Sequence, residues 1–131
     1  MFRHKKKLSA LEWELMEIIW AQEKAVTVRE VLETAYPEGE KAYTTVQTVM
    51  NNLVDKGFLK KEKTGLVNFY TPVAVREKTL EKEVRSFVNR SFGGSLNALV
   101  SFMLDSDALS AEEIRKLKQL IDAREKGEGE L

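Results

Sequence analysis

The sequence predicts a mainly α-helical protein with a small β-hairpin wing, in which a winged helix-turn-helix domain precedes a C-terminal helical dimerisation region. Three observations predict this fold. Hydroxyl residues that precede a glutamate by three positions mark helix starts. A glycine follows the third amphipathic segment, just before a run rich in β-branched and aromatic residues. The order helix, helix, turn, helix and hairpin is that of a winged helix.

The first three helices are predicted from their caps and their apolar spacing. Ser9 and Thr27 each begin a capping box, so one helix runs from about residue 10 to residue 22 and a shorter one begins after Thr27. The shorter helix must stop before Pro37, because proline disfavours helical backbone in the preceding residue. The third helix begins near residue 43 or 44, with Gly57 in the usual stop position.

A hairpin follows the third helix. Residues 58–63 and 66–71 read as its two strands, joined by a turn at Thr64 and Gly65, and Pro72 ends the second strand.

The remainder of the chain is predicted to be helical. It contains a break at Gly93-Gly94, a last helix capped by Ser110, and a tail from about Gly127 that should fray. The expected domains are therefore 1–73 and 74–131. The second is too small to bury its apolar stripes comfortably alone, which favours self-association.

Composition narrows the chemistry available to this chain. Its 131 residues include 21 Lys and Arg, 21 Asp and Glu, one histidine and no cysteine. Without cysteine there is no thiolate nucleophile or cysteine metal centre, and neither a nucleophile-elbow nor a phosphate-loop motif occurs. The sequence predicts no enzyme activity, cofactor or metal site. We also expect no signal peptide and no membrane insertion, hence a cytoplasmic protein.

The polar face of the third helix is the candidate DNA-reading surface. A solvated helix usually carries Glu and Lys, whereas this face carries short groups that can read base edges or hold phosphate oxygens. Lysines beside the hairpin tip would meet phosphates. The candidate DNA-binding residues are Thr44, Thr45, Gln47, Thr48, Asn51, Asn52, Lys60, Lys61 and Lys63.

Each of these features also has a purely structural interpretation. The helix face can be a polar solvent face, and the lysines can discourage pairing at a sheet edge. The basic run from Arg3 to Lys7 is either a phosphate-seeking arm or a frayed, soluble terminus. A winged helix can also serve as a protein-interaction module that binds no DNA.

Three segments give the chain its resemblance to a known family. LSALEWELMEIIW at 8–20, TTVQTVMNNLVDKGFLKKEKTGLVNFYTPV at 44–73 and FGGSLNALVSFMLDSDALSAEEIRKLKQLI at 92–121 resemble the penicillinase repressor family, which includes methicillin-resistance and copper-responsive repressors. The resemblance covers nearly the whole chain, with the motifs in the family's order.

The resemblance implies a homodimeric transcriptional repressor that binds an inverted-repeat operator in double-stranded DNA. It implies that Thr45, Thr48, Asn51 and Asn52 face the groove and that residues 96–121 face the other subunit. The apolar residues expected at this dimer contact are Leu96, Leu99, Val100, Met103, Ile114, Leu117 and Ile121.

Two features of the family are altered here. Its β-lactam-responsive members are cut by a membrane-bound sensor metalloprotease at an Asn-Phe bond in the helix that follows Gly-Gly. The aligned bond is Ser101-Phe102, which keeps the phenylalanine but not the asparagine. This bond and such a protease are the cleavage site and partner that the resemblance implies. The cysteine-rich metal site of the copper-responsive members has no counterpart in a chain without cysteine.

Overall fold

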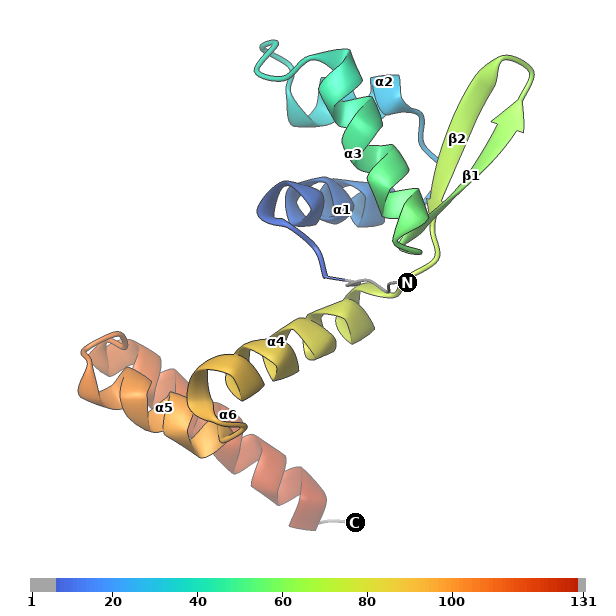
Figure 1. The fold of residues 1–131 in the computed structure, drawn as a ribbon. Helices are drawn as coiled ribbons and strands as arrows, with labels where there is room; N and C mark the ends of the chain where they lie inside the picture. The colour runs from blue at the N-terminus through green and yellow to red at the C-terminus, as the bar shows by residue number, and fades with distance from the viewer. Residues whose placement is uncertain (1–6, 130–131) are drawn as a thin grey trace. The chain divides into compact units, whose positions relative to one another are not determined.

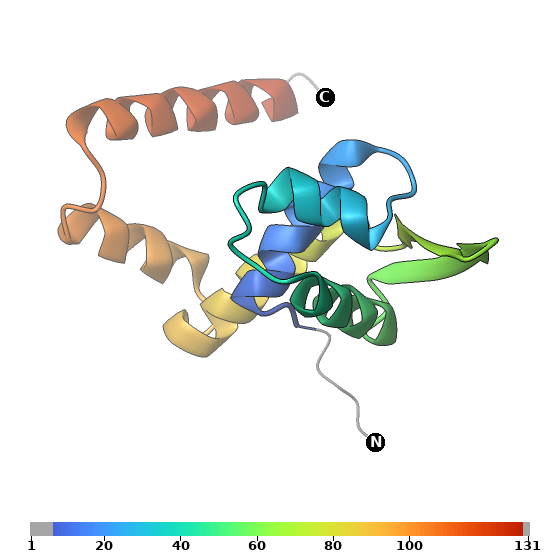
Figure 2. The ribbon, with the colours of Figure 1, turned by 90° about the horizontal axis from the view of Figure 1, so that it is seen from above.

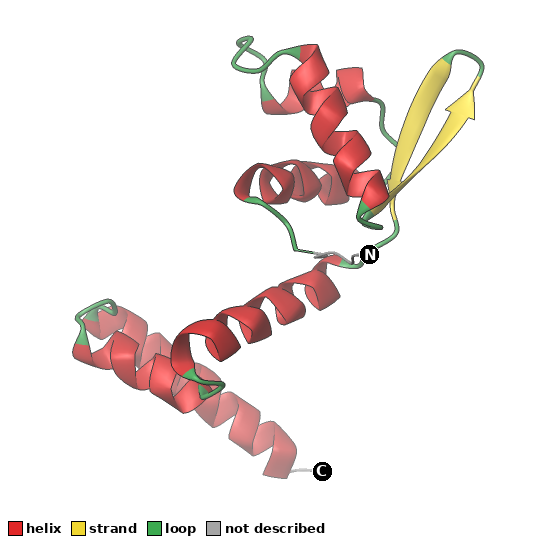
Figure 3. Cartoon of the chain, in the orientation of Figure 1, coloured by secondary structure: helices red, strands yellow, loops and turns green. Residues whose placement is uncertain are grey.

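The computed structural model describes residues 7–129, which form six helices and one hairpin (Figures 1 and 3). The described residues divide into two compact units between Glu83 and Val84. In chain order the elements are α1 (Ala10–Gln22), α2 (Val28–Ala35), α3 (Tyr43–Asp55), β1 (Leu59–Thr64), β2 (Val67–Pro72), α4 (Arg76–Phe92), α5 (Leu96–Asp105) and α6 (Ala111–Gly129). The last helix thus continues past Gly127, where the composition predicts fraying.

All three predicted capping boxes are present. At α1 the Ser9 hydroxyl accepts from the Glu12 amide at 3.2 Å, and the Glu12 carboxylate accepts from the Ser9 amide at 2.8 Å. The same reciprocal pair of bonds begins α2 at Thr27 and α6 at Ser110. Each box satisfies amides that the first helical turn leaves unpaired, so these three helix starts are confirmed.

Gly57 ends α3 as predicted, through a Schellman motif. Its φ is +90°, a left-handed value that glycine adopts without a side-chain penalty. The Gly57 amide donates to the Val54 carbonyl at 3.0 Å, and the Phe58 amide donates to the Leu53 carbonyl at 2.9 Å. Because the Phe58 amide is used in this cap and its side chain is buried, Phe58 is not part of the first strand, which begins at Leu59.

The hairpin pairs antiparallel, from Leu59 opposite Pro72 to Thr64 opposite Val67. Its two-residue loop is Gly65-Leu66, one position later than the predicted turn. Gly65 has a φ of +64° and Leu66 does not have a positive φ, the pattern of a type II′ turn, which matches the twist of the flanking strands. The strands are therefore 59–64 and 67–72 rather than 58–63 and 66–71.

The first unit packs its helices and hairpin around one apolar core. Leu15, Ile19, Met50 and Leu53 are fully buried there, and Tyr70 contributes from β2. The amides of Val26 and Tyr70 each donate to the other's carbonyl, at 2.9 and 2.7 Å, which joins the segment before α2 to the hairpin. The unit is a winged helix, as predicted, and both views show the hairpin projecting from its helices (Figures 1 and 2).

The second unit contains the C-terminal half of α4 together with α5 and α6. Phe92 packs against Phe87 and Phe102, with ring centroids 5.8 Å apart in each pair. Val88 is buried, but α5 has no buried residue. Within residues 7–129, no helix combines the length and apolarity needed to cross a membrane.

Candidate nucleic-acid interface

The polar residues of α3 lie opposite its buried face. Val46, Met50 and Leu53 turn into the core. Of the candidate residues on this helix, Thr44, Thr45, Thr48 and Asn52 are exposed, whereas Gln47 and Asn51 are half-buried. The exposed surface of α3 is therefore a run of hydroxyl and amide groups, chemically suited to base edges and phosphate oxygens, and it ends at the exposed carboxylate of Asp55.

The first turn of α3 has no side-chain cap, because its N-cap residue is Ala42. Amides at such a helix start attract anions, and an exposed start can receive a phosphate. Arg29 of α2 lies beside this end, with its guanidinium 4.9 Å from the centre of the Tyr43 ring. This cation is not among the residues predicted from the sequence, because its position depends on how α2 packs against α3 and no local sequence pattern reveals that packing.

The three candidate lysines of the hairpin lie on two opposite faces of β1. All three are exposed. Side chains alternate along a strand, so Lys61 and Lys63 share one face and Lys60 lies on the other. The Lys61 ammonium donates to Asn51 of α3 at 3.0 Å, which places the face of Lys61 toward that helix. Lys60 instead lies 3.8 Å from the Glu62 carboxylate.

Asn51 joins α3 to both strands of the hairpin. Its Oδ1 accepts from the Lys61 ammonium and from the Tyr70 hydroxyl, each at 3.0 Å. Burial, with a smaller contribution from nearby Tyr43, raises the pKa of Tyr70, so its hydroxyl keeps the proton that it donates. The α3 face and the Lys61 face of the hairpin thus meet at one shared acceptor.

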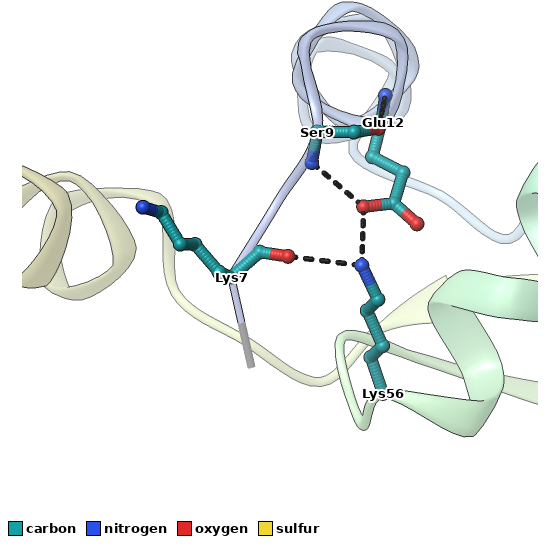
Figure 4. A network of polar contacts seen from close by, with 4 residues as sticks. All are labelled: Lys7, Ser9, Glu12 and Lys56. Carbon is teal, nitrogen blue, oxygen red and sulfur yellow. Dashed lines mark hydrogen bonds and ion pairs between the residues drawn. The ribbon is translucent and has the colours of Figure 1, made fainter. Parts of the chain in front are cut away.

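The other end of α3 is fixed to the start of α1 (Figure 4). The Lys56 ammonium donates to Glu12 Oε1 at 2.7 Å and to the Lys7 carbonyl at 2.9 Å. The same Glu12 oxygen accepts from the Ser9 amide, so one buried carboxylate serves both the cap of α1 and the end of α3. This network fixes the direction in which α3 presents its polar face.

The predicted dimer residues differ in how far their own unit covers them. Leu96, Val100 and Ile121 are 47–61% exposed, whereas Leu99, Met103, Ile114 and Leu117 are half-buried. On α5 and α6, three further apolar side chains are exposed that were not among the predicted dimer residues, namely Phe102, Leu104 and Leu120. Ser101 and Phe102 are both exposed within α5.

Two other sequence features are the basic N-terminal run and the residue types that can bind a metal ion. The basic run from Arg3 to Lys7, interpreted as either a phosphate-seeking arm or a frayed terminus, lies outside the described residues except for Lys7, and so does His4. Among residues 7–129, acidic and histidine side chains form no group able to hold a metal ion.

Comparison with known proteins gives a consistent set of matches. The family model described as penicillinase repressor matches residues 8–123. The penicillinase repressor of Bacillus licheniformis is 34% identical over 116 residues, which are 88% of this chain and 90% of that protein. The methicillin resistance regulatory protein MecI of Staphylococcus aureus (strain N315) is 25% identical over 118 residues, 90% of this chain and 95% of the other.

A solved structure is also similar to part of the chain. The solution structure of the DNA binding domain of the repressor BlaI covers 56% of this chain and 89% of its own, at 28% identity and a TM-score of 0.49.

Proposed function

Because this chain belongs to the penicillinase repressor family, we propose that it acts as a homodimeric transcriptional repressor on an inverted-repeat operator in double-stranded DNA. The family consists of repressors rather than enzymes. A bacterial repressor of this kind works in the cytoplasm, where it blocks transcription by occupying its operator.

The observation that carries the proposal is the junction of α3 and the hairpin. The exposed polar side chains of α3 and the lysine face of β1 meet at Asn51, so one surface offers both base-reading and phosphate-binding groups. We expect α3 to enter the major groove, where Thr45, Thr48 and Asn52 face base edges. Lys61 and Lys63 then meet phosphates beside that groove and supply affinity without sequence preference.

The exposed apolar residues of the second unit support a dimer. Leu96, Val100, Phe102, Leu120 and Ile121 are each 47–66% exposed, although side chains of this kind are normally covered. A second copy of the chain would cover them and would supply a second winged helix for the other half-site. Two linked half-sites bind far more tightly than one.

The implied cleavage bond has a defined setting. Ser101-Phe102 lies inside α5, so a protease must unwind that helix before it can cut. Cleavage there would separate part of α5 and all of α6 from the DNA-binding unit and weaken the dimer. A membrane-bound sensor protease is the partner that would end repression by this route.

Binding to a random-sequence duplex tests the proposal directly. A repressor binds such DNA weakly at low salt and loses it as salt rises. The Lys63→Ala variant should lower the salt slope by about one unit. Lys60 was also a candidate from the sequence, but it lies on the opposite face of the same strand, beside Glu62, so we propose that it does not contact DNA. The Lys60→Ala variant is therefore the matched control and should leave the slope nearly unchanged.

Absence of binding to any duplex would contradict the proposal and favour a protein-interaction module. Equal changes in slope for Lys60→Ala and Lys63→Ala would contradict the assignment of the DNA-facing side of the hairpin.

A further inference from the structure

The hydrogen bonds at Asn51 limit what this residue can do on DNA. An amide oxygen has two lone pairs, and Asn51 Oδ1 already accepts two hydrogen bonds, from Lys61 and from Tyr70. The bidentate pairing of asparagine with adenine uses that same oxygen as the acceptor of the adenine amino group. Asn51 therefore cannot read adenine in this way while it holds both hairpin residues.

The bonds connect the core to the surface through residues of decreasing burial. Tyr70 is 1% exposed and is fixed by its two backbone hydrogen bonds to Val26. Asn51 is half-buried, and Lys61 is exposed and pairs with Tyr70 across the hairpin. The buried Tyr70 hydroxyl thus orients the Asn51 amide, and that amide orients the exposed ammonium of Lys61.

We propose that the chain of hydrogen bonds Tyr70–Asn51–Lys61 positions the hairpin against α3 and directs the Lys61 ammonium at a phosphate beside the groove. This inference rests on the DNA-binding function proposed above. Asn51 and Tyr70 are positioning residues in this role, and Lys61 is the group that touches DNA.

The chemistry of the ammonium suits this arrangement. Lysine has three N–H donors, so the bond to Asn51 leaves two for phosphate oxygens. A lysine side chain loses considerable rotamer freedom when it is held in one place. Because Asn51 already restricts Lys61 in the free protein, less of that cost falls on binding.

The Tyr70→Phe variant separates positioning from direct contact. It removes only a hydroxyl from a residue that is too buried to reach DNA and leaves the ring to fill the core. We expect it to bind a random-sequence duplex about 2- to 10-fold more weakly, as the loss of one hydrogen bond implies. We also expect a lower salt slope, by up to about one unit, which a purely structural loss of stability would not produce.

A double-mutant cycle tests whether Asn51 acts through Lys61. Asn51→Ala should weaken binding to the random duplex in the wild-type background but change it little in a Lys61→Ala background. In a Lys60→Ala background the effect of Asn51→Ala should persist in full, because Lys60 makes no bond to Asn51. Circular dichroism should show that every variant is folded at the temperature of the assay.

Wild-type affinity and slope for both Tyr70→Phe and Asn51→Ala on random duplex would overturn the inference. So would an Asn51→Ala effect confined to a preferred sequence, which would assign Asn51 to base reading. If the wild-type chain binds no duplex, the proposed function fails instead. Side-chain ¹⁵N relaxation of Lys61 then still tests the positioning, because Tyr70→Phe should make that ammonium more mobile and an unchanged ammonium would contradict it.

Discussion

Lys56→Ala should destabilise the winged helix more than the loss of an ordinary surface ion pair. The Glu12 side chain is only 6% exposed, and Lys56, itself 30% exposed, is 2.7 Å from it. Hydrogen bonds to charged groups contribute about 1.5–3 kcal/mol, and removing one partner of a buried pair leaves the other charge without compensation. Partial screening of Lys56 by solvent reduces this effect, so we expect a loss of about 2 kcal/mol.

Urea unfolding followed by tryptophan fluorescence reports on the unit that contains Lys56 and Glu12, because Trp13 and Trp20 both lie in α1 of that unit. With a slope of about 1–3 kcal/mol per molar urea, the midpoint should fall by about 1 M. The matched control is Lys24→Ala, which removes an exposed pair with Glu30 and should cost less than about 0.5 kcal/mol.

A second substitution tests the cause of the destabilisation. Glu12→Gln removes the charge but keeps a side chain that can complete the capping box. In the Lys56→Ala background it should therefore recover part of the lost stability. If Lys56→Ala costs no more stability than Lys24→Ala, or if Glu12→Gln makes the Lys56→Ala protein still less stable, an uncompensated Glu12 charge is not the cause of the loss.

Three further predictions concern the DNA face, the dimer and pH. Thr48→Ala should weaken binding to a duplex of preferred sequence, obtained by selection from a random pool, by roughly 1 kcal/mol and leave binding to random-sequence duplex nearly unchanged. Equal losses on both duplexes in a band-shift titration would mean that Thr48 contacts only phosphate. Ile121→Asp should shift sedimentation toward the monomer, because it would place an unpaired charge in the proposed dimer contact. The control Gln119→Asp should leave the dimer intact. Dimers of both variants would exclude Ile121 from the interface. The hydrogen bonds and charge of Arg76 hold the pKa of Glu17 below its usual range. This pair therefore stabilises the fold at pH values above the ordinary carboxylate pKa, and its contribution is lost as the pH falls through the lowered pKa. A stability difference between wild type and Glu17→Gln that does not shrink in acid would contradict this.

Local features of the fold were predictable because their physics is local. A capping box such as that of Ser9 and Glu12 needs only two residues three positions apart, and the role of Gly57 follows from its lack of a side chain. The one-residue shift of the hairpin arose because Phe58 serves the cap of α3, which a strand pattern does not reveal.

Contacts between distant segments were not predictable in this way. The pairing of Val26 with Tyr70 joins a single residue outside any strand-like run to β2. The polar character of Asn51 is visible in the sequence, but its two partners depend on where the hairpin lies against α3. Likewise, the apolar spacing predicted Leu117 as a dimer residue, although its own unit half-buries it, and did not predict the more exposed Leu120.

The most direct test of the central claim is selection of bound duplexes from a random pool by the wild-type chain of 131 residues. A dimer with one winged helix on each half-site predicts enrichment of an inverted repeat whose half-sites are separated by one helical turn of DNA or a multiple of it. Enrichment of a single unrepeated half-site would contradict the dimeric mode of binding, and recovery of no motif would contradict sequence-specific repression altogether.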